Sequence, residues 1–254
     1  MRFINALANA KTALCAAALM GFTLANLPSV ATAQQTKNLN ADGSLYGRLS
    51  AGAFQPTDTG YSITGTASGL GITASVNVNG DIKTKVGRSF AGAVGYKFGS
   101  FAIEGEIAHQ KADLDEATLN ASVTITSGGN TLNASGSATL DLEGSVSATS
   151  GMVNVLAMLP IGSSDFTPYL GAGVGGVDWE VKLNRISQGS NSLTVNGKES
   201  GTDLAASAIA GFDFKLGESV AGGLRYKYLW TDTGTAYTDD VTAHVFLASV
   251  KIAF

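Results

Sequence analysis

The sequence has little cysteine, proline and charge, and it has no long apolar run beyond its N-terminal segment. Of 254 residues, one is cysteine and four are proline, and charged residues make up 14%, against about 25% in typical soluble domains. The formal net charge is −4 and there is no Lys/Arg cluster. The composition therefore argues against nucleic acid as a partner.

The first 33 residues have the layout of a secretory signal peptide. Arg2 and Lys11 supply positive charge, residues 12–27 are uncharged and mostly apolar, and Ala31-Thr32-Ala33 provides a small-x-small cleavage pattern. Cleavage would leave 221 residues with 14 Lys plus Arg and 20 Asp plus Glu. It would also remove Cys15, so the mature chain is expected to have no disulfide and no cysteine zinc site.

No segment of the mature chain approaches the ~18 apolar residues of a transmembrane helix. The best apolar run, residues 152–161, contains Asn154 and Pro160. Only helices and closed barrels satisfy the backbone hydrogen bonds within lipid. If this exported chain enters a membrane, it must therefore do so as a closed barrel.

Alternation of apolar and polar residues predicts eight strands. Their lengths suit the ~9–11 residues that cross a bilayer at a tilt. Amphipathic helix patterns are nearly absent after the signal peptide. The expected strands are residues 44–54, 84–98, 101–111, 147–159, 168–180, 203–215, 220–230 and 241–254.

The gaps between these strands alternate between long and short, which is typical of bacterial outer-membrane barrels. The pattern predicts an all-β fold: an eight-stranded antiparallel up-and-down transmembrane β-barrel with long extracellular loops and short periplasmic turns. Residues 55–83 are expected to form a long loop. Residues 118–142, with Gly128-Gly129-Asn130 in the middle, are expected to form an external hairpin, and residues 192–198 a weaker one.

Alternation also assigns the two faces of most strands. Apolar residues of one parity are expected to face lipid, with aromatic residues near both interfaces. Polar residues of the other parity are expected to fill the barrel interior as ion pairs and hydrogen bonds. In residues 168–180 glycines blur the alternation and leave the register open. The expected interior network consists of Arg48, Lys97, Glu104, Glu106, Asn154, Arg225, Lys227 and Lys251.

Several short motifs resemble the small outer-membrane β-barrel family, which includes opacity-type surface proteins and the OmpA-type transmembrane barrel. The motifs are Gly95-Tyr96-Lys97-Phe98, residues 101–106, residues 168–175 and residues 224–228. The C-terminal Phe254, with Phe246, Val250 and Ile252 at alternate positions before it, looks like that family's assembly signal.

The resemblance implies a location in the outer membrane of a Gram-negative bacterium, with both termini periplasmic. It also implies insertion by the outer-membrane assembly machinery. Residues 1–33 are then the signal peptide, residues 34–43 a short periplasmic segment and residues 44–254 the barrel. The family includes adhesins, structural proteins, small pores and a few lipid-modifying enzymes, so it implies no single activity.

Four groups of residues are candidate sites, and each has a simpler structural explanation. Gly171 to Gly176 matches G-x-G-x-x-G, but a strand rather than a helix is expected after it. Glu104 and Glu106 could act as an acid/base pair, but interior cations are available to neutralise them. His109 and His244 each lack a serine two residues on. Asp113, Asp115 and Glu116 lack the spacing of a calcium loop. We therefore predict no catalytic residue, no cofactor and no metal site.

The leading functional hypothesis is a non-enzymatic outer-membrane surface protein with a structural, adhesion or surface-antigen role. Loops carry recognition when a rigid scaffold presents them, and the external segments make up nearly half of the mature chain. A small-solute or amphiphile channel, porin-like, is the alternative, and a lipid-modifying enzyme is less favoured. The expected partners are outer-membrane lipid and lipopolysaccharide, the assembly machinery, and a host or surface ligand bound through the loops.

Overall fold

A computed structural model describes residues 43–69, 71–159, 161, 165–232 and 241–254. The expected signal peptide and nearly all of the short segment after it lie outside these residues. The strands are β1 (Ser44–Pro56), β2 (Thr59–Gly69), β3 (Ile72–Thr84), β4 (Gly87–Phe98), β5 (Phe101–Ser127), β6 (Asn130–Met158), β7 (Phe166–Gln188), β8 (Asn191–Lys215), β9 (Val220–Asp232) and β10 (Val241–Ala253). None of the described residues forms a helix able to cross a membrane.

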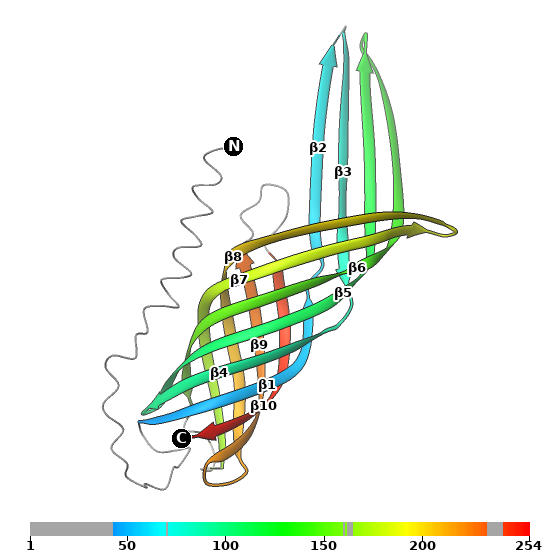
Figure 1. The fold of residues 1–254 in the computed structure, drawn as a ribbon. Coiled ribbons are helices and arrows are strands. Elements are labelled where there is room, and N and C mark those ends of the chain that lie inside the picture. The colour runs from blue at the N-terminus through cyan, green and yellow to red at the C-terminus, as the bar shows by residue number, and fades with distance from the viewer. Residues whose placement is uncertain (1–42, 70, 160, 162–164, 233–240) are drawn as a thin grey trace.

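Eight of the ten strands close into a barrel of antiparallel neighbours. The order around the ring is β1-β4-β5-β6-β7-β8-β9-β10, and β10 pairs with β1 from Tyr46↔Ala253 to Pro56↔Ala243. Each strand pairs with the next barrel strand along the chain, and the last pairs with the first. The all-β, eight-stranded up-and-down barrel expected from the sequence is confirmed (Figure 1).

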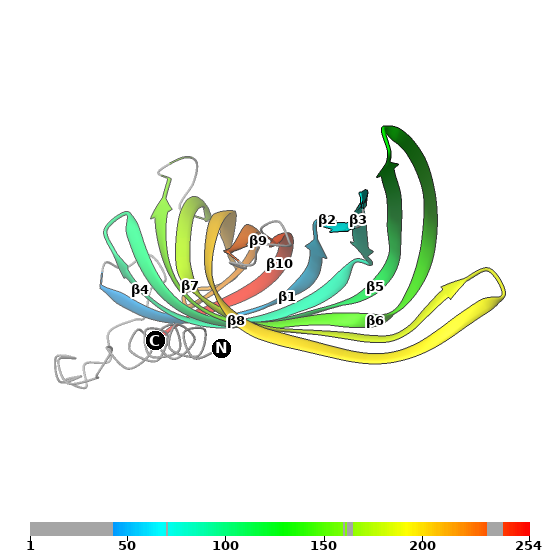
Figure 2. The same ribbon diagram turned by 90° about the horizontal axis from the view of Figure 1, so that it is seen from above.

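The two ends of the barrel differ. Ser44 and Phe254 lie at one end, together with the short connections after β4, β6 and β8. We call this the terminal end, and the opposite end, where β5–β6 and β7–β8 continue, the hairpin end (Figures 1 and 2). Rings gather on the outer surface at the terminal end. The Phe98 and Phe101 rings lie 6.3 Å apart, and the Phe166 and Phe212 rings lie 5.0 Å apart.

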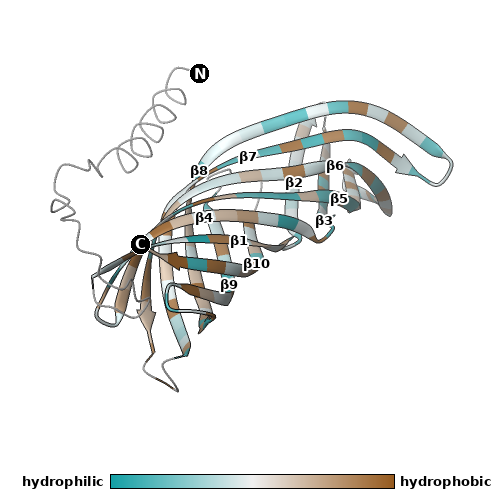
Figure 3. Ribbon diagram, turned by 60° about the horizontal axis from the view of Figure 1, so that its bottom comes forward, coloured by the Kyte–Doolittle hydropathy of each residue, from teal (hydrophilic) through white to brown (hydrophobic). Residues whose placement is uncertain are grey.

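Alternation along each strand separates an apolar outer surface from a mixed interior. On β10, Phe246 and Val250 are exposed, whereas Val245, Leu247 and Lys251 are buried. β9 and β4 show the same pattern, and Figure 3 shows hydrophobic residues recurring along the barrel strands. The period of two in the sequence therefore reports which face is buried.

The register that the sequence left open, in residues 168–180, is settled by the pairing of β7. Val155 pairs with Ala172 on one side, and Ala172 pairs with Ala208 on the other. Tyr169, Gly173 and Val177 face inward and are buried.

Two expectations about element boundaries are wrong. The strand expected over 84–98 begins at Gly87 in the structure, because the chain has already ended a separate strand, β3, at Thr84. Residues 55–83, expected to be a long loop, contain a second hairpin, β2–β3, in which Thr59 to Gly69 pair with Ile82 to Ile72. The hairpin expected at 118–142 is present and is longer than expected, since β5 has 27 residues and β6 has 29.

Beyond the barrel, four strand segments form a sheet that we call the projecting sheet. It consists of β2, β3, residues 117–127 of β5 and residues 130–140 of β6, in that order. Figure 1 shows it rising from the hairpin end, while the outer part of the β7–β8 hairpin extends in another direction. Register shifts between Asp113 and Glu116 on β5 and between Ile82 and Thr84 on β3 mark its base. Such bulges bend strands and re-aim their side chains.

Candidate functional site

The middle of the barrel holds buried ion pairs that we call the interior charge cluster. On one side Arg48 forms a bidentate pair with Asp213, with both N–O distances 2.8 Å. The Nε of Arg48 lies 3.2 Å from Glu104 Oε1, and Tyr46 donates a hydrogen bond to the same oxygen at 2.9 Å. Lys251 adds a longer contact of 3.4 Å to Asp213. This half of the cluster ties together strands β1, β5, β8 and β10.

The other half of the cluster is organised by Arg225 on β9. Its Nη2 lies 2.8 Å from Glu104 Oε2 and its Nη1 lies 3.2 Å from Glu106 Oε2. Lys227 pairs with Glu106, and the Nε of Arg225 donates to Tyr169 Oη at 3.1 Å. Glu104 is therefore shared by two arginines from two different strands.

The cluster contains four cationic and three anionic side chains, all no more than 7% exposed. Buried charges are tolerated only when they are paired and hydrogen-bonded. The surplus cation has an additional partner, because the Nζ of Lys251 lies 4.1 Å from the centre of the Tyr46 ring.

The expected interior residues do not all join these ion pairs. Arg48, Glu104, Glu106, Arg225, Lys227 and Lys251 do. Asn154 is fully buried beside Gly173 and Ser207, where a Cβ on Gly173 would overlap the Asn154 amide. Lys97 is half-buried at the terminal end, opposite Ser44 of β1.

Sequence reasoning missed Asp213, the partner of both Arg48 and Lys251. The sequence contains a signal for it, because Asp213 stands between Phe212 and Phe214 on the strand expected over residues 203–215. An aspartate between two outward aromatics has inward parity.

The arrangement leaves no room for the acid/base chemistry considered for Glu104 and Glu106. Both carboxylates are buried and held by arginine or lysine. A general acid or base must reach a substrate proton directly or through one water.

The glycines of the G-x-G-x-x-G segment lie within strand β7, where atoms of the neighbouring strand β6 approach closely. A Cβ on Gly171 would overlap Leu156, and a Cβ on Gly175 would overlap Gly151.

The two histidines lie on different strands, and each contacts a hydroxyl group of a neighbouring strand. His109 is exposed on β5, with Nδ1 3.0 Å from Thr149 Oγ1. His244 is half-buried on β10, with Nδ1 2.8 Å from the Tyr226 hydroxyl. β4 and β1 lie between these two strands in the ring.

The acidic group at the base of the projecting sheet is paired with lysines. Glu116 lies 2.7 Å from Lys83 and Asp115 lies 3.5 Å from Lys85. The hydrogen bond from Lys83 to Glu116 raises the pKa of that ammonium group. Among the described residues, no group of three or more histidine or acidic side chains could hold a metal ion.

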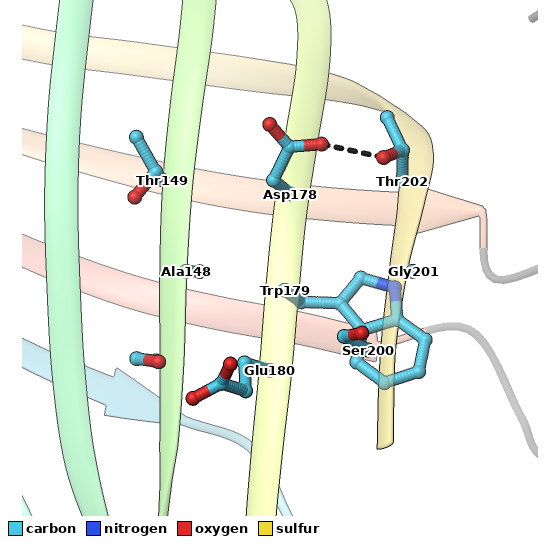
Figure 4. Close-up of a pocket in the computed structure, with 9 residues that line it drawn as sticks. Ala148, Thr149, Asp178, Trp179, Glu180, Ser200, Gly201 and Thr202 are labelled. Carbon is cyan, nitrogen blue, oxygen red and sulfur yellow. Dashed lines mark hydrogen bonds between the residues drawn. The ribbon is translucent and has the colours of Figure 1, made fainter. Parts of the chain in front are cut away.

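A shallow depression of about 550 Å³ lies where β6, β7 and β8 leave the barrel (Figure 4). Thr202 donates a hydrogen bond of 2.5 Å to Asp178 across its outer face. Trp179 donates from Nε1 to Asp203 at 2.6 Å, and its ring lies over Gly201, where a Cβ would come within 2.8 Å of the ring. The depression is therefore a polar patch, with hydroxyls and carboxylates side by side.

The projecting sheet has two chemically different faces. Directly paired residues share a face, so the register fixes its composition. One face, which we call the apolar face, consists of Thr59, Tyr61, Ile63, Gly65, Ala67, Gly69, Ile72, Ala74, Val76, Val78, Gly80, Ile82, Ala117, Leu119, Ala121, Val123, Ile125, Ser127, Asn130, Leu132, Ala134, Gly136, Ala138 and Leu140. The other face, the polar face, consists of Gly60, Ser62, Thr64, Thr66, Ser68, Thr73, Ser75, Asn77, Asn79, Asp81, Thr118, Asn120, Ser122, Thr124, Thr126, Thr131, Asn133, Ser135, Ser137 and Thr139.

A family model for the outer membrane protein beta-barrel domain matches residues 16–254. The chain belongs to this outer-membrane β-barrel family. Membership places the protein in the outer membrane and makes the exposed apolar residues of the barrel wall its lipid-facing surface. A comparison with curated protein sequences found no match.

Several solved outer-membrane barrels have similar structures. Neisserial surface protein A shares 13% identity, with 84% of this chain and 100% of that chain covered and a TM-score of 0.45. Ail of Yersinia pestis, solved with the heparin analogue sucrose octasulfate, shares 12% identity over 84% and 100%, with a TM-score of 0.40. OprG of Pseudomonas aeruginosa shares 15% identity over 84% and 96%, with a TM-score of 0.37.

In this outer-membrane barrel, Glu180 lies beyond the barrel rim, because it pairs with Ser200 above the last β8–β9 pair, Leu204↔Asp232. Lys182 and Lys198 contact its two carboxylate oxygens at 2.7 and 2.6 Å. The hydrogen bonds from these two lysines hold the pKa of Glu180 at about 2. The unfolded value is about 4.3.

We expect the β7–β8 hairpin to lose stability as the pH falls from about 4.5 towards 2. A carboxylate whose pKa is lowered in the folded state stabilises that state only while it stays ionised. The effect will be small and will weaken with salt, since the three side chains are partly exposed. Amide hydrogen exchange across β7–β8 measures it. Glu180→Gln should remove the pH dependence, and Glu199→Gln on the same hairpin should retain it; equal profiles for both variants would refute the assignment.

Proposed function

We propose that this protein is a non-enzymatic surface protein of the outer membrane whose hairpin end acts outside the cell, in adhesion or as a surface antigen. The observation that carries the proposal is the projecting sheet. The chain extends β5 and β6 far past the barrel and adds β2 and β3 beside them. A rigid sheet held away from the membrane supports contact with something outside.

The proposal includes the orientation of the chain, with both termini periplasmic and the hairpin end external. The three short connections at the terminal end support this orientation, because outer-membrane barrels have short periplasmic turns and longer external loops. The proposed environment of the outer surface is outer-membrane lipid and lipopolysaccharide. In this orientation the polar depression around Asp178 and Thr202, where β7 and β8 leave the barrel, faces the external side of the membrane.

Trimming the hairpins tests the proposal. One variant lacks residues 59–82 and replaces residues 118–139 by Asn-Gly, which forms a two-residue turn after the paired Ala117 and Leu140. A second replaces residues 186–193 by Asn-Gly between Arg185 and Thr194. Cells displaying the intact chain should bind host cells or immobilised matrix proteins, and at least one trimmed chain should lose this binding. Heat-dependent gel mobility checks that each barrel is closed. Equal binding by both trimmed chains and the intact chain would contradict the proposal.

The channel hypothesis finds no support in the barrel interior. Arg48, Tyr46, Tyr169, Leu156 and Glu104 are each less than 2% exposed. Side chains therefore fill the middle of the barrel, as expected for an eight-stranded barrel. We expect the protein to give no stable conductance in planar bilayers. Reproducible single-channel steps, absent from matched protein-free bilayers, would revive the channel hypothesis.

The absence of enzymatic activity is also part of the proposal. The carboxylates of Glu104 and Glu106 are sealed in the interior, and His109 and His244 bind Thr149 and Tyr226. Mass spectrometry of lipid A from cells with and without the protein should give identical profiles. A modified lipid A that depends on the protein would contradict this part.

A further inference from the structure

Among the residues that the structure describes, none covers the apolar face of the projecting sheet. Ile63 is 56% exposed, Val76 is 41% exposed and Leu132 is 67% exposed. Such contiguous apolar surfaces on soluble parts of proteins mark interaction sites. Because this sheet continues past the barrel rim, the lipid around the barrel does not cover its outer part.

Three features of the apolar face limit what can cover it. It contains no charged residue. Its polar side chains lie only towards its two ends, Thr59 and Tyr61 near the barrel and Ser127 and Asn130 at the tip, and the Tyr61 hydroxyl donates to the Thr118 carbonyl oxygen. The side chains between these ends are mostly short, with Ala and Gly beside Val and Ile. A charged ligand would find no opposite charge here, whereas a second apolar sheet could pack closely.

The segment between β9 and β10 is too short and too polar to cover the apolar face. It has eight residues, 233–240, and six of them are threonine, glycine or aspartate. The polar face, by contrast, is made almost entirely of Ser, Thr and Asn, with Asp81 near the barrel, and is suited to water. The difference between the two faces therefore points to a partner that meets one side only.

The geometry points to a second copy of this chain: we propose that two copies associate by packing their apolar faces together. This inference rests on the proposed external role of the hairpin end and names its partner. A surface without charge, with short side chains, is complementary to itself and has no like charges to repel a copy. Two sheets packed in this way lie about 10 Å apart.

The area of the face agrees with what a stable dimer needs. β2 has eleven residues; at about 3.3 Å per residue the face is about 36 Å long, and four strands about 4.8 Å apart make it about 19 Å wide. Each copy would bury roughly 700 Å², and the pair roughly 1,400 Å², within the ~1,200–2,000 Å² of stable interfaces.

Single cysteines test the contact. Val123 lies at the centre of the apolar face, paired with Val76, and the neighbouring Ser122 lies on the polar face of the same strand. The full chain displayed on cells carries Val123→Cys or, as the matched control, Ser122→Cys, and is treated with a membrane-impermeant bismaleimide. The chain without either substitution shows the background, because cleavage of the expected signal peptide removes Cys15, the one cysteine of the sequence. We expect a homodimer band severalfold stronger for Val123→Cys than for Ser122→Cys.

Two differently tagged copies locate the contact. A mixed-tag product from mixed cells shows pairing between cells, and one found only on co-expression shows pairing within one membrane; both support the proposal. Equal products for Val123→Cys and Ser122→Cys would overturn it. A product that joins Val123→Cys to a different protein would also overturn it, while leaving the proposed surface role standing.

Aspartates introduced on one face of the projecting sheet provide a second test of the proposed pairing. Val76→Asp with Val123→Asp places like charges opposite each other in the proposed pair, and Asn77→Asp with Ser122→Asp places them on the polar face. Reconstituted in lipid vesicles, the first variant should associate about a hundredfold more weakly, because juxtaposed like charges are strongly unfavourable at an interface. Analytical ultracentrifugation or light scattering of vesicle clustering measures this. Equal association of the two variants would overturn the proposal, with barrel closure in both checked by gel mobility.

Discussion

Replacing Glu104 by alanine is expected to destabilise the barrel by about 3–5 kcal/mol, because removing one partner leaves buried charges uncompensated. Glu104 accepts from Tyr46 and is ion-paired with both Arg48 and Arg225. Without it, the two arginines face each other's charge in a dry interior. Arg48 retains Asp213 and Arg225 retains Glu106, so the barrel should still form.

Glu116→Ala is the matched control for this prediction. It is a glutamate on the same strand, it lies 2.7 Å from Lys83, and its side chain is 34% exposed, whereas that of Glu104 is not exposed at all. An exposed pair contributes only about 0–1 kcal/mol. Urea unfolding of each variant folded in lipid vesicles, followed by tryptophan fluorescence, measures both. Equal shifts in the unfolding midpoint would show that the interior charge cluster does not stabilise the barrel.

The barrel could be predicted from sequence because its strands separate two environments. Lipid and a packed interior favour opposite residue types, so alternation alone predicts that Phe246 faces outward and that Lys251 faces inward. The same contrast indicates that Asp213 faces inward. Sequence alternation does not show that Asp213 pairs with Arg48, which is 165 positions away in the chain. Alternation predicts which side a residue faces but not which partner it meets.

The projecting sheet was harder to predict, for a physical reason. β2 and β3 are built largely of Gly, Ala, Ser, Thr and Asn, with only a few larger aliphatic residues such as Ile63 and Val76. Alternation between alanine and serine is a weak hydrophobic signal, and such a composition is also common in loops. The bulge near Asp113 and Glu116 further shifts the parity of β5. A face could therefore not be followed from the barrel into the sheet by counting residues alone.

Deleting Phe254 is expected to reduce sharply the amount of protein inserted in the outer membrane, with unfolded chain accumulating in the periplasm. We propose that this residue acts with Phe246, Val250 and Ile252 as a signal for the assembly machinery. Its ring is 56% exposed on the outer surface. A terminal aromatic that projects from the last strand is accessible to a receptor before the barrel closes.

The finished barrel should depend much less on Phe254. Its N–H donates to the Leu45 carbonyl oxygen at 2.9 Å, and its ring lies over Gly47, where a Cβ would be 3.2 Å from it. One lost backbone hydrogen bond costs about 0.5–1.5 kcal/mol, and the eleven residue pairs between β1 and β10 remain. Chain without Phe254, refolded from urea into detergent, should therefore still close and keep its heat-dependent gel mobility.

Phe90→Ala is the control that separates assembly from packing. Phe90 is also 56% exposed on the outer surface, but it lies within β4 and not at the chain end. If Phe254 acts through the assembly machinery, its deletion should lower insertion in cells far more than Phe90→Ala does, although both variants refold in detergent. If instead the deletion inserted normally in cells but failed to refold in detergent, Phe254 would be a packing residue of the β1–β10 seam. The exposed ring, the glycine beneath it and the single backbone bond favour the first result, since little of the closed barrel rests on this side chain.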